Sequence, residues 1–371
     1  MDLLTRKLSL QGWQAEINLN KPVERFPNNP ILSSHQVNRV WTNPKYQVKT
    51  VHNVGIAQYK DDVILLFRSH LRNGISVVGV ARSKDGVKDW RIDPKPALKP
   101  CNRNDRFGDG VDKKVLIENE AGGVEDPRIS KIGETYFITY SAYHGTIKDR
   151  VRVSLATTTD FNSFVRHGPL MEVDMRNVVI FPEPFGERYA ALFRPNDHSI
   201  DHTGGVFKEI RIGYTTDLLS NEWDLLEAPL MNQAGGPSAF SDKIGPGAPP
   251  IKTKYGWLNI FHGVRGTMDG NPYTLGIALH DLDNPQKVKV SNIPILFPSA
   301  ADCRTQPTDY VHVPNVVFCC GALRREDGSV LIYYGGNDTV TNVAVTHEDI
   351  LVALCERYPQ NPLSGVPLYD L

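Results

Sequence analysis

The sequence contains no apolar segment long enough to cross a bilayer, which takes about 18 consecutive apolar residues. Its first twenty residues, MDLLTRKLSLQGWQAEINLN, carry charges throughout and lack the apolar core of a signal peptide. We therefore expect a protein with no membrane partner and a cytoplasmic location.

Cysteine is scarce, and its spacing carries no metal or disulfide motif. An odd count and the lack of a CxxC pair argue against a disulfide framework and against a zinc site. A reducing compartment is the simplest interpretation, and we predict no metal site. The five cysteines are Cys101, Cys303, Cys319, Cys320 and Cys355.

Neither sign of charge dominates, because 41 Lys and Arg residues stand against 42 Asp and Glu residues, for a net charge of -1. No global field attracts nucleic acid, so any recognition of an anion has to be local. Hydrophobic residues make up 40% of the chain, which is enough for a sizeable core. The 30 Gly and 26 Pro residues indicate many turns, as in an all-β protein.

One plan recurs five times along the chain: an aromatic-rich β run, a polar connection, and a second alternating strand. Alternation of Val, Ile, Tyr and Phe with a period of two is typical of strands. The second runs, such as SVVGVAR and RVSLATT, place small residues where stacked sheets would crowd large ones. The first runs are DVILLFRSH from Asp62, TYFITYSAYHG from Thr135, RYAALFRPND from Arg188, GWLNIFHGV from Gly256 and VLIYYGGND from Val330.

Five similar sheet units without intervening helical periodicity predict an all-β, five-bladed β-propeller. A β-sandwich with coincidental similarity is the alternative. The repeats start 53 to 74 residues apart, farther than the blades of a WD40 protein, so we expect long loops that build a site on one face. We predict a single domain over residues 1–371, with residues 1–45 as an N-terminal extension that packs on it.

The sharpest local motif is GGVEDPRISKI, from Gly122 to Ile132. Pro127 is expected to push Asp126 into an extended conformation just before a strand. A carboxyl held there and partly desolvated would keep its proton at neutral pH and act as a general acid. The structural alternative is that Asp126 caps a turn while Glu125 or Arg128 pairs on the surface.

A basic group is distributed over several repeats. Arg68, Arg194 and His262 occupy equivalent places at the ends of the first β runs, so we expect them to face one cavity. Buried arginines need a partner, and a planar guanidinium pair matches the oxygens of phosphate or carboxylate. His262 is expected to titrate near neutrality. The alternative is that each cation pairs with an acid in a structural network. The candidate anion-binding residues are Arg176, Arg194, Lys243 and His262.

Short polar side chains at strand ends are suited to sugar hydroxyls. Asn53 lies in VHNVG, and Asp338 follows YYGGN at the matching end of the fifth repeat. Tryptophans form stacking platforms for sugars or pack between blades. We expect blade packing for Trp90 and Trp223, whereas Trp257 is a candidate platform.

Together, EDPR, the Arg-Pro after a β run, GPGAPPIKT, VPNVVF and YYGG-D make the chain resemble the mannoside phosphorylases of glycoside hydrolase family 130, from about Asn53 to Asp349. The resemblance implies a five-bladed propeller in which Asp126 is the catalytic acid. It further implies that Asn53, Arg68 and Asp338 hold the mannosyl unit. Phosphate would be bound by Arg176, Arg194, Lys243 and His262.

The implied reaction is inverting phosphorolysis of a short β-mannooligosaccharide to α-mannose 1-phosphate, with the proton of the acid relayed through a hydroxyl of the mannose. Phosphate is already an anionic nucleophile, so cations that position it replace the base that an inverting hydrolase needs. No metal or organic cofactor is expected, inorganic phosphate is the co-substrate, and a homo-oligomer is left open.

Two features refine the resemblance. AYHG after the EDPR strand is more similar to the branch that acts on β-1,2-linked mannosides. Val311 stands where relatives often carry an acidic residue. The segments Cys101–Lys114 and Ser141–Arg150 are expected to border the subsite of the leaving sugar.

Three other functions are open at this point. The first is an inverting β-mannosidase that uses water, with Glu183 or another acid of the pocket as base. A non-catalytic propeller that binds a glycan or a protein is the second. The third is a furanosidase or fructosidase, which would need a carboxylate on the first repeat, where this chain has Asn53 and Arg68.

Overall fold

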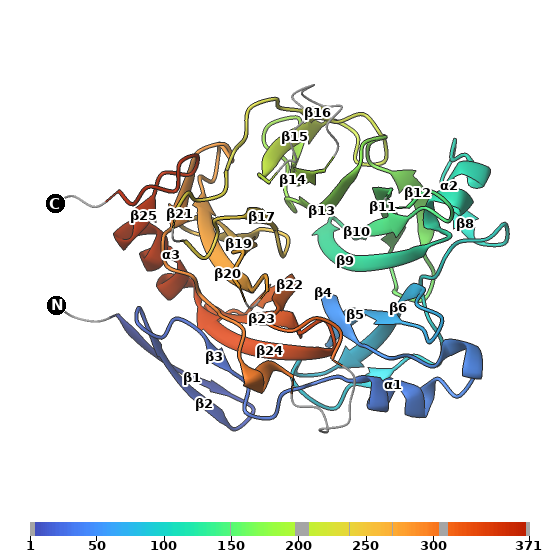
Figure 1. The fold of residues 1–371 in the computed structure, drawn as a ribbon, viewed down its shortest axis with the longest axis horizontal. Helices are drawn as coiled ribbons and strands as arrows, with labels where there is room; N and C mark the ends of the chain where they lie inside the picture. The colour runs from blue at the N-terminus through green and yellow to red at the C-terminus, as the bar shows by residue number, and fades with distance from the viewer. Residues whose placement is uncertain are drawn as a thin grey trace.

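The computed structural model describes residues 4–148, 150–196, 208–236, 238–268, 270–303 and 311–368. Strands dominate these residues, so the all-β prediction is confirmed (Figure 1). No helix in the described ranges is long and apolar enough to cross a membrane. The short helices are α1 (Ser34–Val40), α2 (Lys113–Glu120), α3 (Glu348–Arg357), and the 3₁₀ turns η1 (Pro44–Tyr46) and η3 (Ala300–Asp302).

The largest sheet consists of two antiparallel groups joined by one parallel pair, Ser76 with Gly123. The first group is β4 (His52–Tyr59), β5 (Asp62–His70), β6 (Ser76–Ser83) and β7 (Arg91–Ile92). The second is β9 (Gly123–Ile132), β10 (Thr135–Tyr143), β11 (Val151–Thr158) and β12 (Val165–Pro169), with β8 (Arg106–Phe107) at its edge.

Three further sheets follow along the chain. One holds β13 (Met175–Ile180), β14 (Tyr189–Pro195), β15 (Arg211–Thr215) and β16 (Asp224–Leu225). The next holds β17 (Lys243–Pro246), β18 (Ile251–Thr253), β19 (Gly256–Val264), β20 (Tyr273–His280), β21 (Val288–Ser291) and β25 (Pro359–Gln360). The last holds β22 (Val317–Arg324), β23 (Ser329–Gly336), β24 (Val340–His347) and β3 (Glu24–Arg25).

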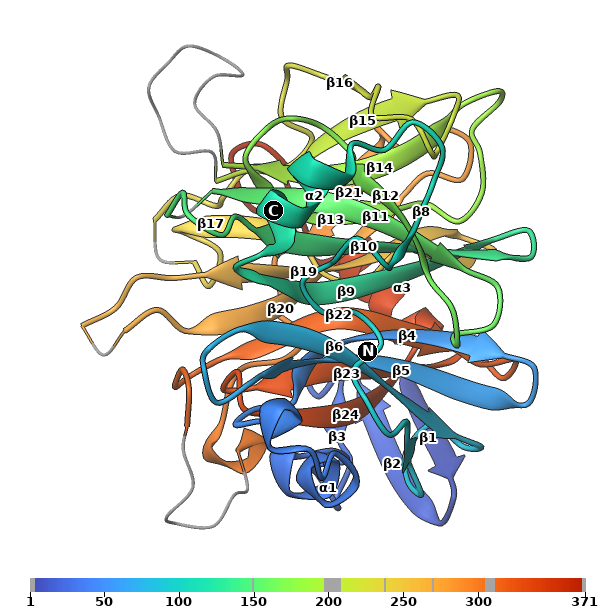
Figure 2. The ribbon, with the colours of Figure 1, turned by 90° about the vertical axis from the view of Figure 1, so that its right-hand side faces the viewer.

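These groups of strands surround a common centre (Figure 1), and Figure 2 shows them from the side. Each predicted aromatic-rich run is the second strand of its group, because an additional strand precedes it: β4, β9, β13, β17 and β22. These first strands were not predicted as a set from the sequence. They lie nearest the centre, and β4 contacts both β9 and β22.

Small residues in the third strands allow close packing, as expected from the sequence. Gly79 lies opposite Phe67, and a Cβ atom on it would come within 2.3 Å of the Phe67 ring. Gly276 has the same relation to Phe261, also at 2.3 Å. Real Cβ atoms do not approach other heavy atoms so closely, so glycine at these two positions leaves room for the aromatic ring of the cross-strand partner.

The described part of the N-terminal segment packs on the last sheet. Strand β3 pairs with β24, and the hairpin of β1 (Thr5–Leu10) and β2 (Trp13–Asn18) precedes it. Arg25 forms an ion pair with the buried carboxylate of Asp302, with Nε and Oδ1 2.8 Å apart. The segment therefore supplies an outer strand.

The tryptophans discussed above are packing residues. Trp223 lies against Phe193, with ring centroids 5.2 Å apart. Trp257 is fully buried against Phe181, so its predicted role as a sugar platform is wrong. Trp90 is partly buried against the largest hydrophobic cluster, as expected.

Candidate active site

Three of the inner strands carry a bulge at the same place, and each bulge places a polar residue at the centre. Between fixed register points, β9 has Asp126 and Pro127 opposite the single residue Tyr140. The same two-against-one register puts Asn53 on β4 and Asn177 on β13. Their φ angles are 48°, 52° and 56° for Asn53, Asp126 and Asn177, which is left-handed backbone that Asn and Asp tolerate better than most residues.

The bulge overrides the local effect of proline at Asp126. Pro127 disfavours helical conformations of the preceding residue and led to the prediction of an extended Asp126. That prediction is wrong, because the extra residue of the bulge takes up a φ of 52°. The consequence for the site is that the Asp126 side chain lines the central pocket.

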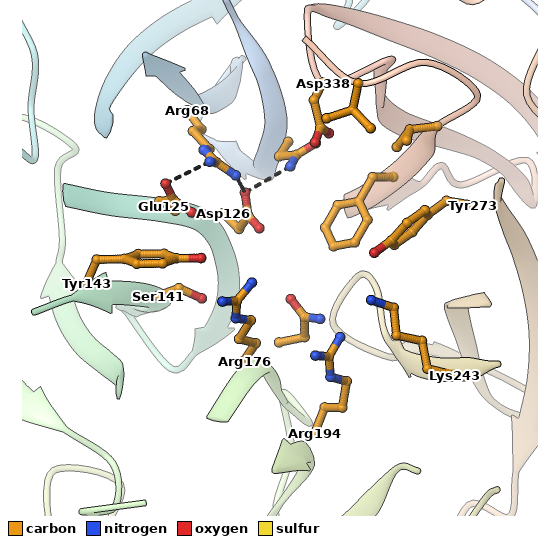
Figure 3. Close-up of a pocket in the computed structure, with 15 residues that line it drawn as sticks. Arg68, Glu125, Asp126, Ser141, Tyr143, Arg176, Arg194, Lys243, Tyr273 and Asp338 are labelled. Carbon is orange, nitrogen blue, oxygen red and sulfur yellow. Dashed lines mark hydrogen bonds and ion pairs between the residues drawn. The ribbon is translucent and has the colours of Figure 1, made fainter. Parts of the chain in front are cut away.

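The pocket has a volume of about 240 Å³ and two chemically different sides (Figure 3). Figure 3 shows Arg68, Glu125, Asp126 and Asp338 on one side, and Arg176, Arg194 and Lys243 across from them. Seven of the eight predicted site residues line it: Asn53, Arg68, Asp126, Arg176, Arg194, Lys243 and Asp338. The others lining it are Glu125, Ser141, Tyr143, Asn177, Tyr273, Val313, Val316 and Phe318.

On the acidic side, one guanidinium holds two carboxylates. Arg68 Nη1 lies 2.9 Å from Asp126 Oδ1, and Arg68 Nη2 lies 2.7 Å from Glu125 Oε1. The side chains of Arg68, Glu125 and Asp126 are only 11 to 13% exposed. Asn53 Nδ2 donates a further hydrogen bond of 2.9 Å to Asp126 Oδ1. Asp126 is thus fixed by two donors from the first group of strands.

The protonation of this side differs from the expectation for Asp126. Burial raises the pKa of Asp126, but Arg68, Arg128 and the Asn53 hydrogen bond together hold it below its usual value. Burial raises the pKa of Glu125, against the opposing effect of Arg68. Burial also raises the pKa of Asp338, to about 6, with Asp126 and Glu125 adding to the shift. Without ligands, Asp126 is therefore ionised at neutral pH rather than protonated.

On the basic side, two arginines face each other across neighbouring strands. Arg176 on β13 is the direct cross-strand partner of Arg194 on β14, and Lys243 begins β17. Among the described residues, none of the three forms an ion pair with a carboxylate. Arg194 Nη2 donates to the neutral Asn196 side chain at 2.8 Å, while the Nε atoms of both arginines are buried without a hydrogen-bond partner. Burial, together with Arg176, lowers the pKa of Arg194 to about 10.

His262 does not line the pocket and instead packs against Phe318, which does. It is fully buried, and its ring packs 4.6 Å from that of Phe318. Burial and the nearby cations Arg194, Arg128 and Lys243 lower its pKa well below the usual value. The expectation that His262 titrates near neutrality is therefore wrong, and its imidazole is neutral.

Arg128 is a central residue that the sequence analysis considered only for a surface pair. It is 2% exposed and connects three inner strands or their loops. Its Nη1 donates to the Asp126 carbonyl oxygen at 2.8 Å, its Nη2 to Asn177 Oδ1 at 2.9 Å, and its Nε to the Gly247 carbonyl oxygen at 2.8 Å. Because Asn177 accepts this hydrogen bond with Oδ1, its amide N–H₂ group remains available to donate to a ligand in the pocket.

Asn177 was missed by the sequence analysis, although a signal was present. The segments HNVGI, EDPRI and RNVVI align Asn53, Asp126 and Asn177 at the same offset before an Ile. Glu183, by contrast, lies outside the pocket. Its side chain is half exposed and pairs with Lys252 on the surface, so it is not positioned as a base.

The profile of glycoside hydrolase family 130, described as beta-1,4-mannooligosaccharide phosphorylase, matches residues 22–357. The chain belongs to this family. The match confirms the resemblance recognised from EDPR and the accompanying motifs.

Relatives of the chain include phosphorylases that are named for β-1,2-linked mannosides. The chain is 30% identical over 332 residues to the 1,2-beta-oligomannan phosphorylase of a Thermoanaerobacter species, covering 87% of this chain and 96% of that protein. It is 34% identical over 272 residues to the beta-1,2-mannobiose phosphorylase of Listeria innocua, covering 71% and 64%. The solved structure of a Listeria innocua beta-1,2-mannobiose phosphorylase with its mannobiose superimposes with a TM-score of 0.72 at 26% identity, covering 90% of this chain and 99% of that one.

Proposed function

We propose that this protein is an inverting β-mannoside phosphorylase that uses inorganic phosphate to release α-mannose 1-phosphate. The observation that carries the proposal is the division of one pocket into a carboxylate side around Arg68 and a side of three cations without an acidic partner among the described residues. Of these cations Arg194 is buried and Arg176 and Lys243 are partly buried. Such a group requires an anion, and phosphate is the nucleophile that such a site positions. Family membership and the phosphorylase relatives support the same reaction.

Each side has a defined task in this reaction. Asn53, Arg68 and Asp338 hold the mannosyl unit, and Asp126 supplies the proton to the leaving sugar by way of a mannose hydroxyl. Phosphate, bound opposite, attacks C1 from the other face, forming the new C1–O bond as the glycosidic bond breaks. Orientation of the two reactants supplies much of the rate.

Phosphate would be held by Arg176, Arg194 and Lys243, with the Asn177 amide as a further donor. His262 would not contact phosphate. Its neutral ring packs against Phe318, which lines the pocket, and lies near Arg194. A neutral His262 avoids a fourth like charge in contact with the cations. No metal or organic cofactor is part of the proposed mechanism, and phosphate is consumed as co-substrate.

We propose β-1,2-linked mannooligosaccharides as the substrates. The support comes from relatives whose names specify this linkage and from AYHG, whose Tyr143 lines the pocket at the end of β10. The segment Ser141–Arg150 that begins there, together with Cys101–Lys114, would border the subsite of the leaving sugar.

We propose that the groups of strands form the five blades of a propeller, each beginning with one of the inner strands, and that residues 1–371 make one domain with residues 1–45 as its extension. Cytoplasmic location and homo-oligomer formation stay predictions.

The test is the release of sugar from β-1,2-mannobiose with and without phosphate. Mannose 1-phosphate that forms only with phosphate is the expected result. Equal release of free mannose without phosphate would identify a hydrolase, and no release from β-mannosides of any linkage would favour a non-catalytic binder.

A further inference from the structure

Three carboxyl groups share one guanidinium on the acidic side of the pocket. Arg68 forms ion pairs with Glu125 and Asp126, and Asp338 lines the pocket beside them. If all three acids were ionised, Arg68 would neutralise only one of the three negative charges in this partly buried space, and Arg128 and Arg176, which form no ion pair with these acids, would offset the rest only in part. Like charges at such distances favour retention of a proton by one member of the group.

The hydrogen-bond pattern indicates which carboxyl retains the proton. Glu125 Oε1 forms an ion pair with Arg68 Nη2 at 2.7 Å and accepts a hydrogen bond from the Ser76 hydroxyl, also at 2.7 Å. Asp126 Oδ1 accepts hydrogen bonds from Arg68 Nη1 and from Asn53 Nδ2, both at 2.9 Å. Asp338 accepts a hydrogen bond from the Asn53 side chain but, among the described residues, forms no ion pair with a cation. It is therefore the carboxyl whose ionised form is stabilised least.

We propose that Asp338, in addition to holding the sugar, carries in the unliganded protein the proton that Asp126 later delivers to the leaving group. The inference rests on the proposed phosphorolysis. In the unliganded protein, at pH values below the pKa of Asp338, Asp338 is protonated and Asp126 is ionised, so the pair holds one proton between them. At higher pH both carboxyls are ionised and the proton is lost. Once sugar fills the pocket, the O–H bond on Asp338 breaks and an O–H bond forms on Asp126 through an intervening hydroxyl, with no net uptake of protons.

The electrostatic environment supports this distribution. Burial and the neighbouring Asp126 and Glu125 raise the pKa of Asp338 to about 6, although Arg68 opposes the shift. Phosphate bound opposite adds negative charge to the pocket and favours the protonated form of Asp126. The other titratable or charged groups around the two carboxyls are Arg128, Arg176, Tyr143, Cys320, and the histidines near Arg68, which are His52, His70 and His312.

The first test needs no activity and uses the unliganded full-length protein with ¹³C-labelled aspartate carboxyl groups. In the native protein and in the control Asp62→Asn, whose carboxylate is on the surface at the other end of β5, one aspartate resonance should titrate near pH 6. That resonance should be missing in Asp338→Asn and should titrate at lower pH in Asp126→Asn, because the neighbouring charge is gone. A resonance near pH 6 that persists in Asp338→Asn would overturn the proposal.

The second test is the pH profile of kcat/KM for mannobiose phosphorolysis. In Asp338→Asn the basic limb should move to lower pH, since Asp126 loses a negative neighbour that favours its protonation. A loss of rate with an unmoved basic limb would mean that Asp338 only binds sugar, contrary to the proposal. If no mannose 1-phosphate forms at all, the proposed function fails, while the carboxyl titration still decides where the proton lies.

Discussion

Arg176 and Arg194 lie directly opposite each other on β13 and β14, although like charges in that relation destabilise a sheet. Burial and this neighbour lower the pKa of Arg194 to about 10. The repulsion costs stability in the unliganded protein, and in the proposed reaction a phosphate between the two guanidinium groups would relieve it. Under this proposal, a residue pair that is unfavourable for folding is favourable for binding phosphate.

Arg194→Gln should raise the KM for phosphate by about tenfold or more, because a charge-assisted hydrogen bond is lost. Its free energy of unfolding should stay unchanged or increase, since the repulsion by Arg176 disappears. Phosphate kinetics and urea unfolding measure the two effects. Arg188→Gln is the matched control, because Arg188 precedes the same strand but is half exposed and pairs with Asp224. Unchanged phosphate kinetics in Arg194→Gln would remove this residue from the site.

Asp126→Asn should lower kcat by about 100-fold or more, as expected for loss of a general acid. The fold should be retained, because Asn accepts the left-handed backbone at this bulge. Steady-state rates and circular dichroism check both parts. Activity close to that of the native protein would exclude Asp126 as the acid.

Asn177→Asp should raise the KM for phosphate by about tenfold or more, because a carboxylate would then face the bound anion. The new charge would also pair with Arg128, which donates to Asn177 Oδ1 at 2.9 Å. Asn162→Asp is the control, since Asn162 is exposed and accepts from Arg82 at 3.0 Å. Equal phosphate affinity in the two variants would contradict a role for Asn177.

Stability should fall as the pH decreases from 7 to 5, because buried histidines are neutral in the folded protein. Burial lowers the pKa of His280 to about 4, whereas an unfolded chain binds the proton near pH 6.5. Between these values the unfolded state binds more protons, so His280 alone should remove about 2 kcal/mol at pH 5.

Urea unfolding at both pH values measures this change. His280→Gln should show a smaller loss between pH 7 and 5 than the native protein, whereas the exposed His35→Gln should show the native loss. The same pH dependence in His280→Gln and native protein would contradict the assignment.

The repeats made part of this architecture predictable. Equivalent strand ends carry Arg68 and Arg194, and both side chains line the pocket as expected. The first strand of each group was harder to identify, because a bulge interrupts the alternation at Asn53, Asp126 and Asn177. A two-against-one register changes which residues face the centre. Neither the strand propensity of the residues nor the period of the hydrophobic pattern predicts such a register.

The electrostatics of the site could not be predicted from residue types. Asp126 was expected to be protonated because it is buried, but Arg68, Arg128 and Asn53 reverse the effect of burial. His262 shares the repeat position of Arg194, yet its ring packs behind the wall against Phe318. Both outcomes depend on contacts between residues far apart in the chain.

The bulges on β4, β9 and β13 also distinguish pocket positions that tolerate few amino acids from pocket positions that tolerate many. Asn53, Asp126 and Asn177 occupy backbone that accepts few residues other than Asn, Asp and Gly. Arg194 and Lys243 lie on ordinary strand backbone. Engineering toward another attacking nucleophile, such as arsenate, should therefore begin with the strand positions, where the choice of amino acid is wide.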